Sequence, residues 1–218
     1  MAITMVHPQI VNGYFARRGG LAIRHAASEA EAEAYFLTEL EAPLRRRAQE
    51  SIEFYRDRAT AAASMQCALP TAGGSATSPT SAVLPESYAD TIDIADPCSV
   101  HFYDCAHFRG ESFRLGGLHD RAIDSDLDLA QRRRADLDGG WSEAISSVDT
   151  GNLVGAVLLF DRPFFRGDRL EVWCDISDLT RVPQHGYVGH WSDRACSVAC
   201  AGVDVPRTEV LAHCGALR

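Results

Sequence analysis

The clearest hydrophobic pattern in this 218-residue chain lies in its second half, where apolar and polar positions alternate over short runs. Val100 and Phe102 begin one run, and Phe113 and Leu115 alternate with polar residues in the next. A period of two, with β-branched and aromatic residues, is typical of half-buried strands. Gly110 marks a position where a side chain would clash, through a positive φ or a close backbone approach. The segment therefore predicts a folded β-hairpin.

This hairpin pattern occurs twice, which indicates an internal duplication. Residues 157–170 repeat the pattern of residues 100–113. A second anchor also repeats, because the tryptophan-serine-acid sequence that opens residues 141–148 opens residues 191–198 as well. Two anchors in the same order predict two successive copies of one β-unit.

The two copies differ in length. Gly167 follows Gly110 by 57 residues, whereas Trp191 follows Trp141 by 50. The first copy therefore carries an insertion, which falls within residues 119–138. This segment is charged and is flanked by glycines, so a short helix is one conformation open to it.

The returning strand of the second copy alternates in the same way as that of the first. Leu170 and Val172 are its inward positions, and Asp168, Arg169 and Glu171 are its polar positions. The alternation predicts that one face of this strand packs in a core and the other face is polar.

Helical patterns precede the β-units. Ser28, followed three residues later by Glu31, is the N-cap and capping-box signature of a helix, here over about 28–41. A second helix is expected over about 43–65, since Pro43 suits a first helical turn. The apolar stripe is too short for the sustained heptads of a coiled coil.

Three further segments lack a regular period. Residues 1–27 contain glycine breaks but are too apolar for a free tail, so we expect them to dock on this chain or another. Residues 70–96 are rich in Pro, Gly, Ser, Thr and Ala and predict a flexible linker. Residues 204–218 predict a short tail. The chain is thus predicted to be α+β, with an N-terminal helical arm over 1–69 and an all-β domain over 97–203.

The repeated hairpin resembles the βγ-crystallin family, whose hallmark is an aromatic residue, four residues, a second aromatic residue, one residue and glycine. A serine near the end of each unit is the family's second mark. The matching residues are Tyr103, Phe108, Gly110 and Ser147 in the first copy and Phe160, Phe165, Gly167 and Ser197 in the second. The resemblance covers about half of the chain. It implies two Greek keys, over about 98–150 and 154–203, that form one β-sandwich.

The resemblance also implies where calcium would bind. The family motif has two Asn/Asp residues, two variable residues, Ser/Thr and then Ser, and the two motifs exchange ligands. Here the motifs are SEAISS at residues 142–147 and SDRACS at residues 192–197. Both have serine in place of the first Asn/Asp, and the second has Cys196 where an oxygen belongs. Sulfur is a poor ligand for a hard cation, so these departures weaken the site.

Ligand exchange pairs Asp193 with Ser146, which keeps an acid and a hydroxyl, and Glu143 with Cys196, which does not. We therefore expect at most one calcium site, of weak affinity, centred on the first pair, and no other cofactor. The candidate ligands are the side chains of Asp193, Ser146, Glu143, Ser142 and Ser192 and the backbone carbonyls of Arg194 and Ala144. The Arg194 guanidinium would place a positive charge beside the ion. The alternative is that both loops serve only as turns.

Other candidate chemistry is weaker. Two cysteines and two histidines between residues 98 and 107 fit no zinc spacing, and strand alternation separates Cys98 from the rest. His185 and His190 flank a predicted surface loop. No nucleophile elbow, phosphate-binding glycine loop or His-Glu-x-x-His motif occurs in the sequence. A non-enzymatic protein is therefore expected.

Composition excludes some partners. The net charge of −9 disfavours nucleic acid and is compatible with a cation. The sequence has no run of 18 apolar residues, so no membrane span is predicted. The opening residues lack a secretory pattern. With seven cysteines, an odd number, we expect reduced thiols and a location in the cytoplasm or in a particle assembled there.

These patterns predict a structural or binding protein built on a βγ-crystallin-like domain. The alternative is a subunit of a larger cellular or viral assembly, docked through the helical arm over 1–69. In that alternative the chain would form a homo-oligomer or a larger protein complex.

Overall fold

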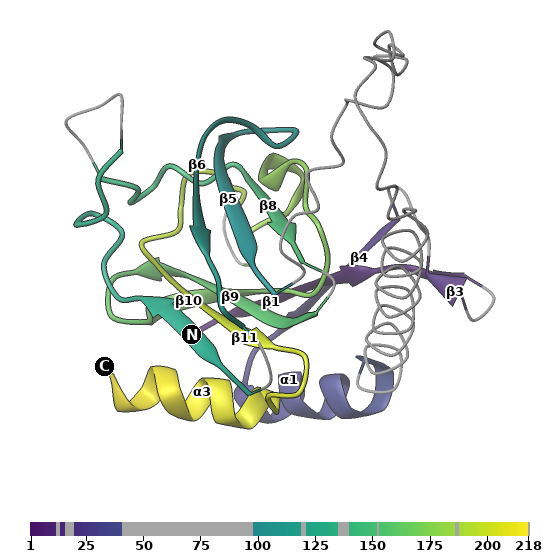
Figure 1. The fold of residues 1–218 in the computed structure, drawn as a ribbon. Coiled ribbons are helices and arrows are strands. Elements are labelled where there is room, and N and C mark those ends of the chain that lie inside the picture. The colour runs from purple at the N-terminus through teal and green to yellow at the C-terminus, as the bar shows by residue number, and fades with distance from the viewer. Residues whose placement is uncertain are drawn as a thin grey trace, which may run out of the picture.

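The computed structural model describes residues 1–11, 14–15, 20–40, 98–118, 121–134, 140–151, 153–185 and 188–217. The second predicted helix, over 43–65, and the predicted linker, over 70–96, lie outside these residues. Within them the chain is mostly β-sheet with short helices (Figure 1). The α+β layout with a separate helical arm is therefore not confirmed. No helix in the described ranges is long and apolar enough to span a membrane.

The first Greek key contributes four strands. They are β5 (Val100–Cys105), β6 (Arg109–Leu115), β7 (Ile123–Asp126) and β8 (Ser147–Thr150). The smaller sheet has the order β6-β5-β8, and both of its pairings are antiparallel. Strand β7 leaves this sheet and pairs instead with a strand of the second key.

The second key contributes β9 (Val154–Arg162), β10 (Arg166–Val172), the 3-10 helix η3 (Leu179–Arg181) and β11 (Ser197–Gly202). Its strands form the run β10-β9-β11-β7 in the larger sheet. Ile176 forms an isolated bridge with Val148 on β8. The third segment of each key, β7 in the first and the segment at Ile176 in the second, therefore pairs with the sheet of the other key. The two keys form one sandwich.

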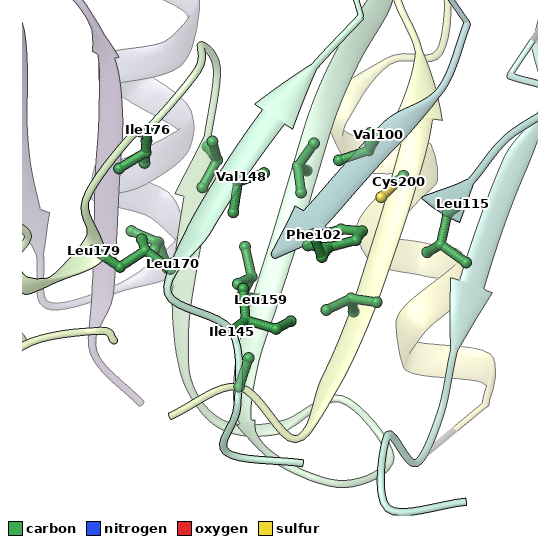
Figure 2. Packing of buried hydrophobic residues seen from close by; sticks show 14 of the residues in the cluster. Val100, Phe102, Leu115, Ile145, Val148, Leu159, Leu170, Ile176, Leu179 and Cys200 are labelled. Carbon is green, nitrogen blue, oxygen red and sulfur yellow. The ribbon is translucent and has the colours of Figure 1, made fainter. Parts of the chain in front are cut away.

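The core lies between these two sheets (Figure 2). Phe102 packs on Phe113 with ring centroids 4.8 Å apart, and Phe113 meets Trp141 edge to face at 4.7 Å. Leu170 and Val172 face this core, as their alternation predicts. The inward positions of both keys thus interlock in one hydrophobic cluster.

The N-terminal residues add two strands to the larger sheet. Strand β1 (Ile3–Pro8) pairs parallel with β10 and antiparallel with β4 (Leu21–Ala26). The full order is β4-β1-β10-β9-β11-β7, and two short strands, β2 (Ile10–Val11) and β3 (Tyr14–Phe15), pair with each other. Strands β1 and β4 therefore dock on this chain, as expected, but the expectation that glycines prevent regular structure in residues 1–27 is wrong. Strand β1 lacks a clear alternation because it is buried on both faces.

Two helices cover the outer face of the larger sheet (Figure 1). Helix α1 (Glu29–Tyr35) begins with Ser28, whose Oγ accepts a hydrogen bond from the Glu31 N–H, and it continues as the π-helix η1 (Phe36–Leu40). Helix α3 (Arg207–Ala216) occupies most of the predicted C-terminal tail. The tail prediction is wrong because Val210 and Cys214, one turn apart, are buried in the cluster on this face.

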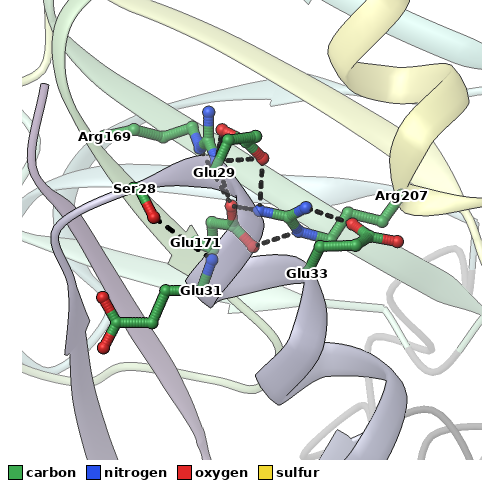
Figure 3. Close-up of polar contacts among 7 residues, drawn as sticks. All are labelled: Ser28, Glu29, Glu31, Glu33, Arg169, Glu171 and Arg207. Atoms are coloured by element: carbon green, nitrogen blue, oxygen red, sulfur yellow. Dashed lines mark hydrogen bonds and ion pairs between the residues drawn. The ribbon is translucent and has the colours of Figure 1, made fainter.

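A buried ion cluster joins both helices to β10 (Figure 3). Arg169 and Arg207 both bind the Glu171 carboxylate, which is fully buried. The nitrogen–oxygen distances are 2.5 and 2.9 Å from Arg169 and 2.7 and 3.0 Å from Arg207. Glu29 of α1 lies 2.9 Å from Arg169 and 2.7 Å from Arg207, and Glu33 of α1 binds Arg207. The N-terminal segment is thus tied to the sandwich by paired charges as well as by backbone pairing.

Candidate functional site

The folded hairpins have the same construction in both keys. Phe108 has φ +58° and Gly110 has φ +81°, and a Cβ on Gly110 would lie 1.9 Å from Oδ1 of Asp104. The Ser147 hydroxyl accepts a hydrogen bond from the Phe108 N–H at 3.1 Å and donates one to the Cys105 carbonyl at 2.7 Å. The serine therefore fixes the hairpin fold, and glycine is required by both its φ and its neighbour.

The second key repeats this arrangement. Phe165 has φ +54° and Gly167 has φ +77°, and a Cβ on Gly167 would lie 1.8 Å from Oδ1 of Asp161. The Ser197 hydroxyl accepts from the Phe165 N–H at 3.0 Å and donates to the Arg162 carbonyl at 2.8 Å. The residues of the aromatic-glycine-serine pattern thus act together as one local structure.

The two loops that carry the predicted calcium motifs contact each other. Glu143 and Asp193, at equivalent positions, have φ values of +56° and +57°. The Glu143 N–H donates to the Ala195 carbonyl at 2.8 Å, and the Asp193 N–H donates to the Ile145 carbonyl at 3.0 Å. This reciprocal pairing places the second residue of each motif against the other motif. The two motifs therefore lie side by side in the structure.

We call the pairing of Asp193 with Ser146 the first loop pair and that of Glu143 with Cys196 the second loop pair. The first loop pair brings together three side-chain oxygens. The Ser146 hydroxyl donates to Oδ1 of Asp193 at 3.1 Å, and the Ser192 hydroxyl donates to Ser146 Oγ at 3.2 Å. Ser146 and Ser192 are buried, whereas Asp193 is exposed. A carboxylate open to solvent, backed by two buried hydroxyls, is a set of hard oxygen donors.

Asp104 belongs to the same neighbourhood. Its Oδ1 is buried without a hydrogen-bond partner, while its Oδ2 pairs with Arg134. The neighbouring Cys105 thiol has a raised pKa, mainly through its interaction with Asp104, with a smaller contribution from Asp193. Sequence reasoning missed Asp104. The available signal was the acid that follows the first aromatic residue of both hallmark motifs, Asp104 and Asp161.

The second loop pair has different chemistry. Burial, together with the charges of Glu143, Asp161 and Asp128, raises the pKa of the Cys196 thiol, which a hydrogen bond with Ser142 partly offsets. A protonated thiol is a poor ligand for calcium. This pair therefore gathers negative charge around a sulfur rather than around a hydroxyl oxygen.

Arg194 also acts at the second loop pair. Its guanidinium donates to Oε1 of Gln184 at 3.0 Å, and its charge acts on the Asp161 carboxylate. Burial raises the pKa of Asp161 overall, although Arg162 and Arg194 oppose this. The positive charge of Arg194, which was expected beside Asp193, thus acts on Asp161 at the second loop pair. The described contacts give no role to the backbone carbonyl of Ala144.

The cysteines and histidines between residues 98 and 107 do not gather into one cluster in the structure. No group of three or more His, Cys, Asp or Glu residues in the described ranges is arranged to hold a metal ion. Cys98 is buried and Cys105 is exposed, in agreement with their separation by strand alternation. Cys105, Cys196 and Cys200 are free thiols.

No family model matches the chain, and no curated protein matches it. Several solved structures are similar to part of it, among them the following three. The N-terminal domain of protein S is 20% identical, covers 49% of this chain and 99% of its own, and has a TM-score of 0.34. A βγ-crystallin from Ciona intestinalis is 18% identical, with coverages of 46% and 95% and a TM-score of 0.33. Hahellin, a βγ-crystallin, is 18% identical, with coverages of 50% and 98% and a TM-score of 0.34.

The strand exchange between the two keys and the duplicated aromatic-glycine-serine structure define the class of this domain. Residues 98–202 form a βγ-crystallin-like domain, to which residues 1–40 and α3 add strands and helices.

Proposed function

We propose that the chain is a non-enzymatic structural or binding protein whose sandwich holds one calcium ion beside Asp193. The contact between Ser146 and Asp193, at 3.1 Å, supports this most directly because it joins the two motifs through oxygen atoms. The ion would be held by these two side chains and by Ser192, with water and backbone carbonyls completing the coordination.

The charge around the first loop pair supports the same proposal. The buried Oδ1 of Asp104 has no hydrogen-bond partner, and the Cys105 thiol senses both Asp104 and Asp193. A bound cation would compensate the negative charge there. With Arg134 already paired to Asp104, however, few uncompensated carboxylates face the ion. Calcium affinity decreases when fewer charged ligands surround the ion, so the site would be weak.

Calcium bound at this position would act on stability. Because its ligands come from both Greek keys, the ion would bind the folded domain and not the unfolded chain. Such a ligand adds about 2.7 kcal/mol to the free energy of unfolding at a concentration 100 times its Kd. The proposed role is therefore a module whose stability follows the calcium concentration.

The test is a calcium titration of the full chain by calorimetry, with melting followed in calcium and in chelator. Asp193→Asn removes the charge with little change in shape and is expected to abolish binding. Glu209→Gln, a change of an exposed acid on α3 outside both motifs, is the control and should leave binding intact. No heat and no shift in melting for the unchanged chain, or equal loss in both variants, would refute the calcium proposal.

The assembly alternative has less support. The apolar residues of β1 and α1 pack on this chain's own sheet, so they are not available for a partner in this arrangement. Light scattering on the full chain tests the alternative, because a stable oligomer would require an interface elsewhere on the molecule.

A further inference from the structure

Two histidines from distant parts of the sequence meet beside the N-terminal edge of the larger sheet. His25 lies on β4, the edge strand, and His185 lies in the loop after η3. Their ring centroids are 5.1 Å apart and their planes are inclined at 67°. Both side chains are exposed to solvent. The pair therefore joins the N-terminal hairpin to the second Greek key at a point that an ion can reach.

Thr4 fixes the orientation of the first ring. Its Oγ1 lies 3.2 Å from Nδ1 of His25, its cross-strand partner, and Thr4 itself is 1% exposed. A histidine that ligates a metal through one nitrogen usually has its other nitrogen held by a hydrogen bond. With Nδ1 held by a buried hydroxyl, Nε2 is the nitrogen left for a ligand.

The spacing of the rings suits two ligands of one ion. With metal–nitrogen distances of about 2.1 Å and a tetrahedral angle between them, the centroids of two ligating imidazoles lie about 5 Å apart. The observed 5.1 Å agrees with this value. The rest of the coordination would be open to water.

We propose that His25 and His185 form an open two-histidine site for a divalent transition-metal ion of the Zn²⁺ or Ni²⁺ type. This site differs from the calcium site in its nitrogen donors and its place in the fold, and it does not depend on that proposal. An ion bound here would tie β4 to the loop of the second key. Metal binding would then strengthen the docking of residues 1–40 on the sandwich.

The test is a Ni²⁺ titration of the full chain by calorimetry, because Ni²⁺ suits imidazole ligands. It uses a Cys105→Ser background, which removes the exposed thiol as a competing ligand. One ion per chain is expected, together with a higher melting temperature. His25→Ala and His185→Ala should each weaken binding about tenfold or more, since even outer-shell partners of a metal contribute that much.

His190→Ala is the matched control, because this exposed histidine belongs to the same loop and is not part of the pair. It should bind Ni²⁺ as the background protein does, and circular dichroism checks that all variants fold. Excess Ca²⁺ should not compete. Absence of binding by the background protein, or binding unchanged in either His25→Ala or His185→Ala, would overturn the proposal.

Discussion

The strands β6 and β10 occupy equivalent places in the two Greek keys, yet their outward faces have different surroundings. On β6 the outward residues Ser112 and Arg114 are exposed. At the equivalent positions of β10, Arg169 is 1% exposed and Glu171 is fully buried. The inward residues of both strands pack in the same core. The inward residues of the duplicated unit are therefore buried in both copies. The burial of its outward residues depends on which other segments of the chain pack against them.

The covering segments explain this difference. Residues 1–40 and α3 pack on the sheet of the second key and bring Glu29, Glu33 and Arg207 to the polar face of β10. An arginine or glutamate taken out of water requires a partner of opposite charge. Helices α1 and α3 supply these partners, so the charged residues on the outer face of β10 are buried in ion pairs.

The largest expected effect comes from breaking the buried cluster. Glu171→Ala leaves Arg169 and Arg207 without their shared carboxylate and should lower the free energy of unfolding by about 3–5 kcal/mol. Arg114→Ala, the equivalent exposed position on β6, should change it by less than about 0.5 kcal/mol. Urea unfolding of both variants measures the difference. Similar losses in the two would show that burial of the second face contributes little.

The hairpin serines should behave alike despite the different surroundings of the two keys. Ser147→Ala and Ser197→Ala each remove two hydrogen bonds to the hairpin backbone, one from an N–H and one to a carbonyl. Each should cost about 1–3 kcal/mol. Denaturant unfolding again supplies the measurement, and Ser112→Ala is the exposed control. A large inequality between the two serines would mean that the covering segments also support the hairpin of the second key.

The smallest expected effect concerns pH. Burial alone would raise the pKa of Glu29, but the charges of Arg169 and Arg207 and its bonds to them lower it below its ordinary value of 4.5. A lowered folded-state pKa stabilises the protein above the unfolded value, and this contribution is lost as pH falls through the folded value. Because Glu29 is half exposed, solvent limits it to less than about 1 kcal/mol.

Melting curves between about pH 6 and pH 3 test this contribution. The unchanged chain should lose more stability over this range than Glu29→Gln, which has no charge to lose at that position. Glu209→Gln is the control, because its ion pair with Arg121 is exposed. Equal pH dependence of all three proteins would exclude a contribution from Glu29.

Much of the sandwich could be predicted from the sequence. Gly110 and Gly167 stand out because no other residue suits their φ and their close neighbours, and Ser28 with Glu31 marks the start of α1. The contact of Ser146 with Asp193 also agrees with the motif pairing, although calcium binding itself remains a prediction. These features depend on residues close in the sequence or on a repeated motif.

The covering segments could not be predicted in the same way. Strand β1 is buried on both faces, so its sequence has no period of two. Arg169, Glu171 and Arg207 carry charges, and charged residues are ordinarily taken as exposed. Their burial depends on distant partners. Arg169, for example, pairs with Glu29, which lies 140 residues away in the sequence. Long-range ion pairing leaves no local pattern.

The parallel pairing of β1 with β10 has a consequence for synthesis. Ala2 donates its backbone N–H to Asp168, a residue 166 positions later. At about 5–20 residues per second, the ribosome needs roughly ten to thirty seconds between the two. During that interval β1 can pair with β4 only, and its other edge has no partner. The β1–β4 hairpin therefore has one unpaired strand edge until the second Greek key has been synthesised. During this time the edge can form non-native pairs with other strands.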